Sequence, residues 1–259
     1  MWGAPEGTIR ANIQTMLSLA GKVAIVTGGS RGIGRAIAAA FLREGGHVTI
    51  TGLNPDHLKE AAQELSSIAA GGASIDTAAA DVRDHAAVES LVAETARRHS
   101  GLDILVNNAG VGWFGSVESE SHDEWRHVID TNITGVFNCC RAAIPHLRQR
   151  GGGWIVNISS LAGSNPFGGG AGYCASKAAV DVFSEALMQE VRQDGIRVSY
   201  IKPGSVHTEF MGRADHGPAG NDWKLQPEDV AQVVIDLVAH DVRSLPSRVD
   251  IRPAKPPRK

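Results

Sequence analysis

Cysteine is scarce in this sequence, with three residues, Cys139, Cys140 and Cys174, in a chain of 259. They include no Cys-x-x-Cys pair, and the neighbours Cys139 and Cys140 are poorly placed to form a disulfide with each other. The sequence therefore predicts neither a disulfide scaffold nor a zinc site. We expect reduced thiols in the core of a cytoplasmic protein.

Neither sign of charge dominates, and long hydrophobic runs are absent. The formal net charge of −3 provides no basic field of the kind that attracts a nucleic-acid backbone. No apolar stretch approaches the roughly 18 residues of a membrane-spanning helix, and the segment 23–26 is too short for the apolar part of a signal peptide. None of the 10 histidines lies at a metal-ligand spacing such as His-Glu-x-x-His. We therefore expect a soluble protein that binds no nucleic acid, membrane or metal.

What the sequence does contain is the composition and pattern of an α/β domain, with 42% hydrophobic and 20% charged residues. From residue 22 onward, short β-branched runs alternate with longer alanine-rich amphipathic stretches. The predicted strands are 23–27, 47–51, 74–78, 102–106, 154–158, 198–201 and 248–251. The predicted helices are 33–44, 56–69, 85–98, 123–148, 172–194 and 227–239. This alternation predicts a doubly wound α/β fold, with helices on both faces of a parallel sheet.

Two segments lie outside this alternation. Residues 1–18 precede the first strand and include Met16 near their end, so we expect either a disordered N-terminal extension or a start assigned too far upstream. Residues 19–259 are predicted to form a single domain. Within it, the segment of about 205–226 shows no periodicity, and from Phe210 it mixes glycine, proline, aspartate and histidine. We expect a loop there that covers a substrate.

A glycine-rich turn follows the first predicted strand directly. It reads Thr-Gly-Gly-Ser-Arg-Gly-Ile-Gly over residues 27–34 and leads into a helical run. In a dinucleotide-binding turn, Gly28 permits the tight bend, Gly32 lets the backbone approach a pyrophosphate, and Gly34 lets the helix pack closely. The helix N-terminus also offers free N–H groups to phosphate. The order of strand, turn and helix predicts a Rossmann-type nucleotide site, with a tight turn that binds nothing as the alternative.

The end of the second predicted strand bears on the choice between NADP and NAD. NAD-binding folds usually carry an acidic residue about twenty residues after the glycine turn, whereas Thr-Gly-Leu-Asn stands here at 51–54. Nothing there repels a 2′-phosphate, and the Arg31 guanidinium in the turn could pair with one. The sequence favours NADP over NAD, with a solvated loop cation as the alternative role of Arg31.

Tyr173 and Lys177 lie four residues apart in a predicted helix, so they share one face. A phenol has a pKa of about 10, and a nearby ammonium would stabilise the phenolate and lower that pKa. Upstream, Ser159 and Ser160 end a predicted strand, where a hydroxyl can hydrogen-bond a substrate oxygen. A Tyr-x-x-x-Lys pair by itself occurs on many ordinary helices, so only its combination with other motifs is specific.

Six motifs occur together in one order along the chain. They are Thr27 to Gly34, Asn107 to Gly110, Asn132, Ser160, Tyr173 with Lys177, and Pro203 with Gly204. This ordered set resembles that of the short-chain dehydrogenase/reductase family, from about residue 19 to at least residue 208.

The resemblance implies roles for a catalytic tetrad. Tyr173 would be the general acid in reduction and the general base in oxidation, and Ser160 would orient the carbonyl. Lys177 would bind the nicotinamide ribose and lower the pKa of Tyr173, while Asn132 would hold a water that links Lys177 to solvent. Ser160 lies thirteen positions before Tyr173, as the family's serine does, and strand alternation points Ser159 the other way.

The resemblance also implies the cofactor contacts. Asp81 and Val82 are similar to the family's adenine contact, residues 108–110 to its adenosine-ribose wall, and residues 203–208 to its nicotinamide contacts. Asn107 is expected to stabilise the sheet instead. The expected cofactor-binding residues are Gly28, Ser30, Arg31, Gly32, Ile33, Gly34, Asn54, Asp81, Val82, Asn108, Ala109, Gly110, Tyr173, Lys177, Pro203, Gly204, Val206 and Thr208.

These features predict an NADP(H)-dependent oxidoreductase that transfers a hydride between nicotinamide and a ketone, an aldehyde or a secondary alcohol. Aromatic loop residues suggest an apolar substrate portion, or only anchor the loops to the domain. The candidate wall residues are Trp113, Phe114, Ser164, Phe167, Phe210, Met211 and Trp223. His207 is expected to be an exposed imidazole rather than a substrate contact.

Several alternatives stay open. Reduction of 3-oxoacyl thioesters is one, although residues 245–253 lack the Val-Asp-Gly-Gly ending of many such reductases. An NAD-dependent alcohol dehydrogenase of the same family, a non-catalytic cofactor-sensing protein and a sugar-nucleotide epimerase are others. The resemblance implies a homodimer or homotetramer, in which the helix before the Ser160 strand and the Tyr173 helix commonly form a dimer face.

Overall fold

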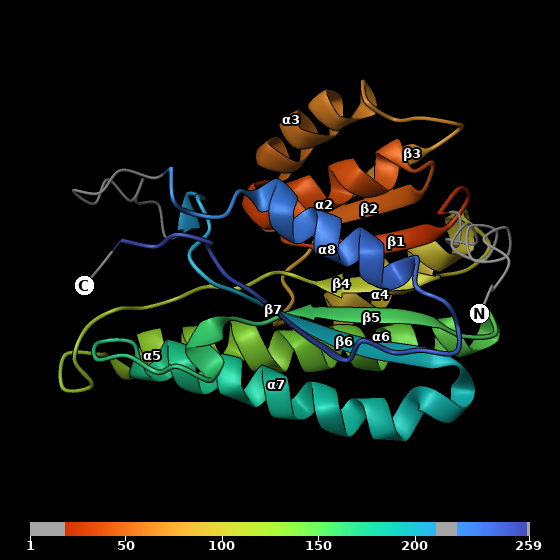
Figure 1. The fold of residues 1–259 in the computed structure, drawn as a ribbon. Coiled ribbons are helices and arrows are strands. Elements are labelled where there is room, and N and C mark those ends of the chain that lie inside the picture. Colours follow the sequence, from red (N-terminus) through yellow and green to blue (C-terminus); the bar gives the residue numbers. More distant parts are fainter. Residues whose placement is uncertain (1–18, 211–221, 258–259) are drawn as a thin grey trace, which may run out of the picture.

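The computed structural model describes residues 19–210 and 222–257. Within them, seven parallel strands form one sheet in the order β3-β2-β1-β4-β5-β6-β7 (Figure 1). The strands are β1 (Val23–Thr27), β2 (His47–Gly52), β3 (Ser74–Ala79), β4 (Ile104–Asn107), β5 (Gly153–Ile158), β6 (Ile196–Pro203) and β7 (Arg248–Ile251). The predicted doubly wound parallel sheet is confirmed.

Helices cover both faces of the sheet, as predicted. They are α2 (Gly32–Arg43), α3 (Pro55–Ser66), α4 (His85–Arg98), α5 (His122–Ile129), α6 (Gly135–Gln149), α7 (Ala171–Val191) and α8 (Pro227–Val238). One apolar cluster joins α2, α3 and α8 to the sheet, and a second joins α4, α6 and α7 to its other face. None of these helices is long and apolar enough to cross a membrane.

The central strands β1 and β4 are buried along their whole length because helices cover both faces of the sheet. Every residue of β1 is buried, as expected for a strand in the middle of a parallel sheet. On one side β1 pairs with β2, and on the other it pairs with β4. The strand order therefore reverses between β1 and β4, and such a switch point leaves a crevice for ligands at the carboxyl ends of the strands.

One predicted helix is wrong. The predicted helix 123–148 is divided into α5 and α6 by a π-helical turn, Asp130–Thr134. Within this turn, the Asn132 amide bonds both to the segment that follows β4 and to α7, which no local helix signal reveals. The predicted helix 172–194 ends in a short 3₁₀ turn, Arg192–Asp194. The other predicted bounds agree with the structure to within three residues.

The predicted substrate loop of about 205–226 is described only at its two ends. There Val206 and Leu225 form an isolated parallel bridge, in which the Leu225 N–H donates to the Ser205 carbonyl at 3.0 Å. Residues 211–221, and the predicted extension 1–18, lie outside the described residues. After β7, the chain continues through Arg252 to the strand-end side of the molecule (Figure 1).

The three cysteines are free and buried, as predicted. Burial raises the pKa of the Cys139 thiol to about 12 and that of Cys140 further. Thiols held in this protonated form are poor nucleophiles and metal ligands. They serve as packing residues of the α6 and α7 layer.

Candidate active site

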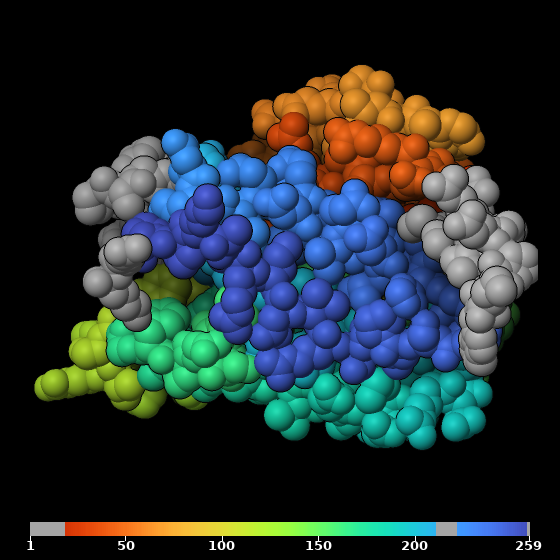
Figure 2. Space-filling model, in the orientation of Figure 1, coloured from red at the N-terminus to blue at the C-terminus, as the bar shows by residue number. Residues whose placement is uncertain are grey.

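A pocket of about 1770 Å³ opens at the carboxyl ends of the strands. In the space-filling view the surface is hollowed between the blue C-terminal residues and the green residues that follow β5 (Figure 2). Every expected cofactor-binding residue except Gly34 lines this pocket. Of the expected catalytic residues, Ser160, Tyr173 and Lys177 line it. The fold thus brings one site together from residues more than 200 positions apart, such as Gly28 and Arg252.

The glycine turn is built by close packing. A Cβ atom on Gly34 would lie 2.3 Å from the Gly28 carbonyl oxygen and 2.4 Å from Asn108 Nδ2, so no side chain fits there. Gly34 therefore lets α2 pack against the turn, as predicted, and does not itself line the pocket. Gly32 has a φ of +54°, in the left-handed region that other residues avoid.

Asn108 fastens the glycine turn to the end of β4. Its Nδ2 donates to the carbonyl oxygens of Thr27 and Gly28, at 2.9 and 3.1 Å. In return, Thr27 Oγ1 accepts from the backbone N–H groups of Asn108 and Ala109, both at 3.0 Å. Asn107 points elsewhere and donates to Asn157 of the neighbouring strand at 2.8 Å, which confirms its predicted role in the sheet.

The β2 end of the pocket contains no carboxylate side chain among its lining residues Thr51, Gly52, Leu53, Asn54 and His57. Asn54 Oδ1 caps α3 by accepting from the backbone N–H groups of Asp56 and His57, at 2.9 and 3.2 Å. The side chain of Asn54 is therefore committed to the helix end. Arg31 also lines the pocket, and the hydroxyl of its neighbour Ser30 lies near Gly52 at the end of β2.

Asp81 does place a carboxylate in the same region, but its charge is paired. Arg83, which belongs to no motif recognised in the sequence, donates to it at 2.6 to 3.0 Å and lowers the pKa of Asp81. Arg83 Nη1 also lies 3.1 Å from His127 Nδ1. Arg83 lines the pocket as well, so its guanidinium balances the negative charge of Asp81 at this end of the site.

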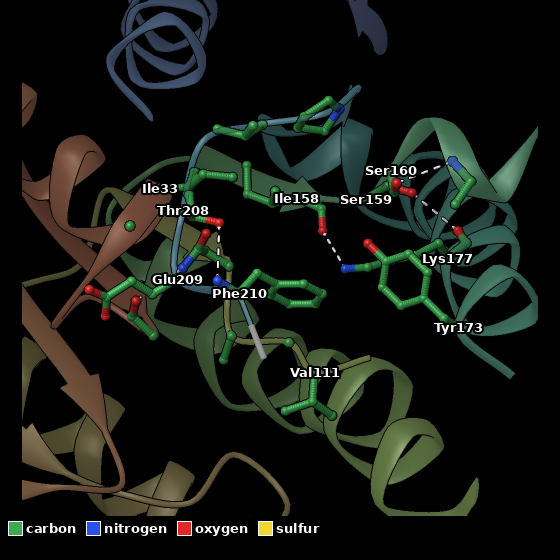
Figure 3. A pocket seen from close by; sticks show the side chains of 18 of the residues that line it. Ile33, Val111, Ile158, Ser159, Ser160, Tyr173, Lys177, Thr208, Glu209 and Phe210 are labelled. Atoms are coloured by element: carbon green, nitrogen blue, oxygen red, sulfur yellow. Dashed lines mark hydrogen bonds between the residues drawn. The ribbon is translucent and has the colours of Figure 1, made fainter. Parts of the chain in front are cut away.

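Lys177 lines the pocket and is almost fully buried, with 6% of its surface exposed. Its Nζ donates to the Ile158 carbonyl at 3.0 Å and lies 5.9 Å from the centre of the Tyr173 ring (Figure 3). Burial lowers the pKa of Lys177 to about 8, and the charge of Asp181 offsets part of this effect. An ammonium with such a pKa exchanges its proton readily near neutral pH.

Two aromatic rings pack near the ring of Tyr173. Phe114 meets it edge-on at 5.6 Å between ring centres, and Phe210 lies at 6.0 Å. Burial raises the pKa of Tyr173 above its ordinary value, and a hydrogen bond with Ser160 offsets part of the rise. Desolvation of the phenol thus outweighs the hydrogen bond, and the expected lowering of the Tyr173 pKa by Lys177 stays a prediction.

The two serines at the end of β5 have different partners, as strand alternation predicts. Ser160 Oγ accepts from the Ala162 N–H at 3.1 Å, at the start of the short 3₁₀ turn Leu161–Gly163. Ser159 Oγ instead donates to the Lys177 carbonyl at 3.2 Å (Figure 3). It also donates to Asp181. Ser160 is thus the hydroxyl that accompanies Tyr173 at the pocket.

Asn132 lies in the π-helical turn and is buried, outside the set of lining residues. Its Oδ1 accepts from the Val111 N–H at 2.9 Å, and its Nδ2 donates to the Val111 carbonyl at 2.8 Å and to Ser176 Oγ at 2.9 Å. The Asn132 side chain thus ties the segment after β4 to α7, which bears Tyr173 and Lys177.

The expected substrate wall is only partly assembled. Trp113, Phe114, Phe167, Phe210 and Trp223 line the pocket, whereas Ser164 does not and Met211 lies outside the described residues. His207 is exposed and does not line it, as expected.

Some lining residues were missed by sequence reasoning. They include Glu209, Lys224, Arg252, Pro253, Pro256 and Pro257. The last four follow the final strand, where no periodicity or motif signals that the chain returns to the pocket.

Comparison with known proteins agrees with this geometry. A family model described as short chain dehydrogenase matches residues 22–218. The 3-oxoacyl-[acyl-carrier-protein] reductase FabG of Chlamydia muridarum is 37% identical, over 86% of this chain and 92% of its own length. The glycine betaine reductase ATRR of Emericella nidulans is 38% identical over 84% of this chain, but the match spans only 17% of that longer protein.

Among solved structures, a metagenomic short-chain oxidoreductase in complex with NADP superposes with a TM-score of 0.79. It is 36% identical, and the match covers 92% of this chain and 100% of that one. The matched family model spans the glycine turn, Ser160, Tyr173 and Lys177. The chain therefore belongs to the short-chain dehydrogenase/reductase family of oxidoreductases.

Proposed function

We propose that this protein is an NADP(H)-dependent carbonyl reductase, which acts in reverse as an alcohol dehydrogenase. The observation that carries the proposal is the convergence of Ser160, Tyr173 and Lys177 in the pocket that contains the glycine turn. This convergence favours catalysis over the sensing of a cofactor, because a sensor needs no phenol beside a buried ammonium.

The described residues fit a bound dinucleotide. The pocket extends from Asp81 and Arg83 past the glycine turn to Tyr173. Two buried hydroxyls belong to residues of its wall, Thr51 Oγ1 and Thr131 Oγ1, and have no hydrogen-bond partner among the described residues. Buried polar atoms usually find a partner, so these hydroxyls suit a polar ligand. When bound, the nicotinamide supplies or accepts the hydride.

The chain's own residues would manage the carbonyl oxygen and its proton. The Ser160 hydroxyl would donate to the carbonyl oxygen and orient it. Tyr173, whose raised pKa keeps it protonated at neutral pH, would give its proton to the same oxygen. Lys177, with a pKa of about 8, would restore that proton and bind the ribose. Asn132 would hold the Tyr173 helix in place.

Two observations support NADP rather than NAD. No carboxylate stands at the end of β2, where it would accept the ribose hydroxyl and repel a 2′-phosphate. Arg31 lines the pocket next to Ser30, whose hydroxyl lies near Gly52 of β2, and offers a planar guanidinium, the group that pairs best with phosphate. The relative of known structure that carries NADP is in keeping with this proposal.

The aromatic wall supports a substrate with an apolar portion next to its carbonyl. Phe114 and Phe167 pack at 5.8 Å between ring centres, and both belong to the exposed apolar residues of the chain. Exposed rings beside a pocket favour a bulky ketone or aldehyde. A 3-oxoacyl thioester belongs in the same panel, because the Chlamydia relative is named for that reaction.

The test is a panel of ketones, aldehydes, 3-oxoacyl thioesters and alcohols, assayed with both cofactors by the absorbance of the reduced nicotinamide. We expect turnover with NADPH, and a loss of about a thousandfold in kcat for Tyr173→Phe, because a general acid contributes about 10²- to 10⁴-fold. Cofactor affinity, measured by fluorescence titration, should stay within about twofold in this variant. Full activity of Tyr173→Phe would overturn the proposed mechanism, and product formed without net cofactor oxidation would indicate an epimerase.

We also propose one domain over residues 19–259, with 205–226 as its substrate loop, and a homo-oligomeric assembly. Large apolar side chains are exposed on the α5, α6 and α7 layer, namely Trp125, Phe137 and Val182, the last with 70% of its surface exposed. Apolar side chains gathered on neighbouring helices support an interface between copies of the chain.

A further inference from the structure

A largely buried ion pair joins α7 to β6 next to the site, with side-chain exposures of 1% for Lys202 and 14% for Asp181. Asp181 follows Lys177 by one turn of α7, and Lys202 stands in β6 immediately before Pro203. Lys202 is 1% exposed, and its Nζ donates to Asp181 Oδ2. Neither residue belongs to a motif identified in the sequence, and neither lines the pocket.

Each member of the pair also binds one serine hydroxyl. Asp181 Oδ1 accepts from Ser159 Oγ, and Lys202 Nζ donates to Ser164 Oγ. Ser159 is further tied to α7 by its 3.2 Å bond to the Lys177 carbonyl.

These contacts form a closed ring around Ser160. Ser159 immediately precedes Ser160 in the chain, and Ser164 follows the short 3₁₀ turn Leu161–Gly163. The chain on both sides of Ser160 is therefore held by one ion pair. The same pair is anchored in α7, the helix that bears Tyr173 and Lys177.

Stability alone is a weak reason for such a pair. Burying two charges costs desolvation energy that their attraction often fails to repay, and an apolar replacement is often as stable. What a hydrogen-bonded buried pair provides is a fixed geometry. Here that geometry sets the distance between the end of β5 and α7, on which Ser160 and Tyr173 respectively lie.

We propose that Asp181 and Lys202 are positioning residues that clamp the segment around Ser160 against α7, so that its hydroxyl and the Tyr173 hydroxyl meet the same substrate oxygen. This role rests on the proposed reductase function. Misplacing a reacting group by about 1 Å can cost about a hundredfold in rate, so the clamp should be visible in kcat.

The chain offers a matched control. Glu185 lies one turn beyond Asp181 on α7 and accepts from the Tyr200 hydroxyl of β6 at 3.0 Å. It therefore joins the same two elements as the ion pair, but further from the site. The protein has only two tyrosines, Tyr173 and Tyr200. Each tyrosine thus reports on one of the two links.

The first measurement is kinetic. We expect Ser159→Ala and Asp181→Asn to lower kcat at least about tenfold while cofactor affinity stays within about twofold. Ser164→Ala should also lower kcat, and Ser164→Thr, which keeps the hydroxyl, should restore it. Glu185→Gln should keep the kcat of the native protein. The clamp would be overturned if the folded variants Ser159→Ala and Asp181→Asn kept the kcat of the native protein. It would also be overturned if Glu185→Gln lowered kcat as much as these variants do.

The single substitution at Asp181 leaves a buried charge and can unfold the protein. The double variant Asp181→Leu with Lys202→Met removes both charges and should fold with native thermal stability. Its kcat should still be at least about tenfold below that of the native protein. A double variant with native kcat would contradict the proposal.

The second measurement needs no turnover. In protein labelled with ¹³Cζ-tyrosine, Ser159→Ala should move the Tyr173 resonance and leave that of Tyr200, and Glu185→Gln should do the reverse. A Tyr173 resonance unchanged by Ser159→Ala would overturn the clamp, whether or not the enzyme turns over. Absence of turnover in the native protein, with these shifts present, would instead count against the proposed function alone.

Discussion

Lys177 shows how burial prepares a single residue for chemistry. Its pKa falls from 10.5 to about 8 because the ammonium is desolvated, although Asp181 opposes this fall. The folded state thus binds fewer protons than the unfolded state between these two values. Stability must then increase as the pH rises from about 8 to about 10.5, and the charged form of Lys177 destabilises the fold below pH 8.

This linkage gives a prediction for Lys177→Met. The free energy of unfolding of the native protein should increase, relative to the variant, by about 3 kcal/mol between pH 7 and pH 10.5, since one pKa unit corresponds to about 1.4 kcal/mol. Urea unfolding of both proteins at several pH values measures the difference. Parallel pH curves would show that the pKa of Lys177 is not lowered. The exposed Lys59, replaced by Met, is the control.

Arg31 bears on cofactor choice at the same scale. If its guanidinium pairs with the 2′-phosphate, Arg31→Ala should weaken NADPH binding about ten- to hundredfold, because a charge-assisted hydrogen bond contributes about 1.5 to 3 kcal/mol. NADH binding should stay within about twofold. Isothermal titration of the native protein and the variant with NADPH and NADH measures both affinities. An equal loss of affinity for the two cofactors would show that Arg31 contacts the pyrophosphate or only stabilises the loop.

Among the elements, the π-helical turn is the one that sequence reasoning could not find. Apolar periodicity continues through 123–148, so a single helix was the natural prediction. The wider turn coincides with the buried Asn132 amide, which finds its partners on two other segments. Partners distant in sequence leave no local pattern, whereas the glycine turn was predictable because its strand, bend and helix are consecutive.

Asn132→Ala should show what this tie contributes. The change leaves the backbone N–H and carbonyl of Val111 without their side-chain partners. We expect unfolding to become easier by about 1 to 3 kcal/mol, and kcat to fall because α7 is less firmly placed. Chemical denaturation and steady-state kinetics measure the two effects. Native stability together with native kcat would contradict this view of Asn132.

For the whole molecule, the exposed apolar layer gives a prediction about assembly. Val182→Glu places a charge on the outer side of α7, where 70% of the Val182 surface is exposed. If α7 faces a second copy, this variant should shift an oligomer toward the monomer in sedimentation velocity. Val242→Glu is a control of equal exposure, at 71%, outside the helices. The proposed interface would be contradicted if the native protein were a monomer, or if both variants dissociated to the same extent.

The overall architecture was predictable because it is repeated along the chain. Each β-branched run and each amphipathic stretch carries its own signal, and parallel strands place their carboxyl ends on one side. The pairing of Asp181 with Lys202 and the return of Arg252 to the pocket were not predictable. Both depend on contacts between segments that only the folded sheet brings together.

The turn at Asp130–Thr134 has a consequence for how this chain can change in length. Each residue of an α-helix advances the helix by about 100°, and a π turn absorbs one additional residue. Because the turn absorbs that residue, deleting one residue there should give a continuous helix in which α6 keeps its rotation against α5, and Cys139, Cys140 and Leu147 should still face the sheet. A residue added or removed within α5 or α6 would instead turn these side chains away from the sheet. The chain length is therefore adjustable at this turn and fixed along the helices on either side of it.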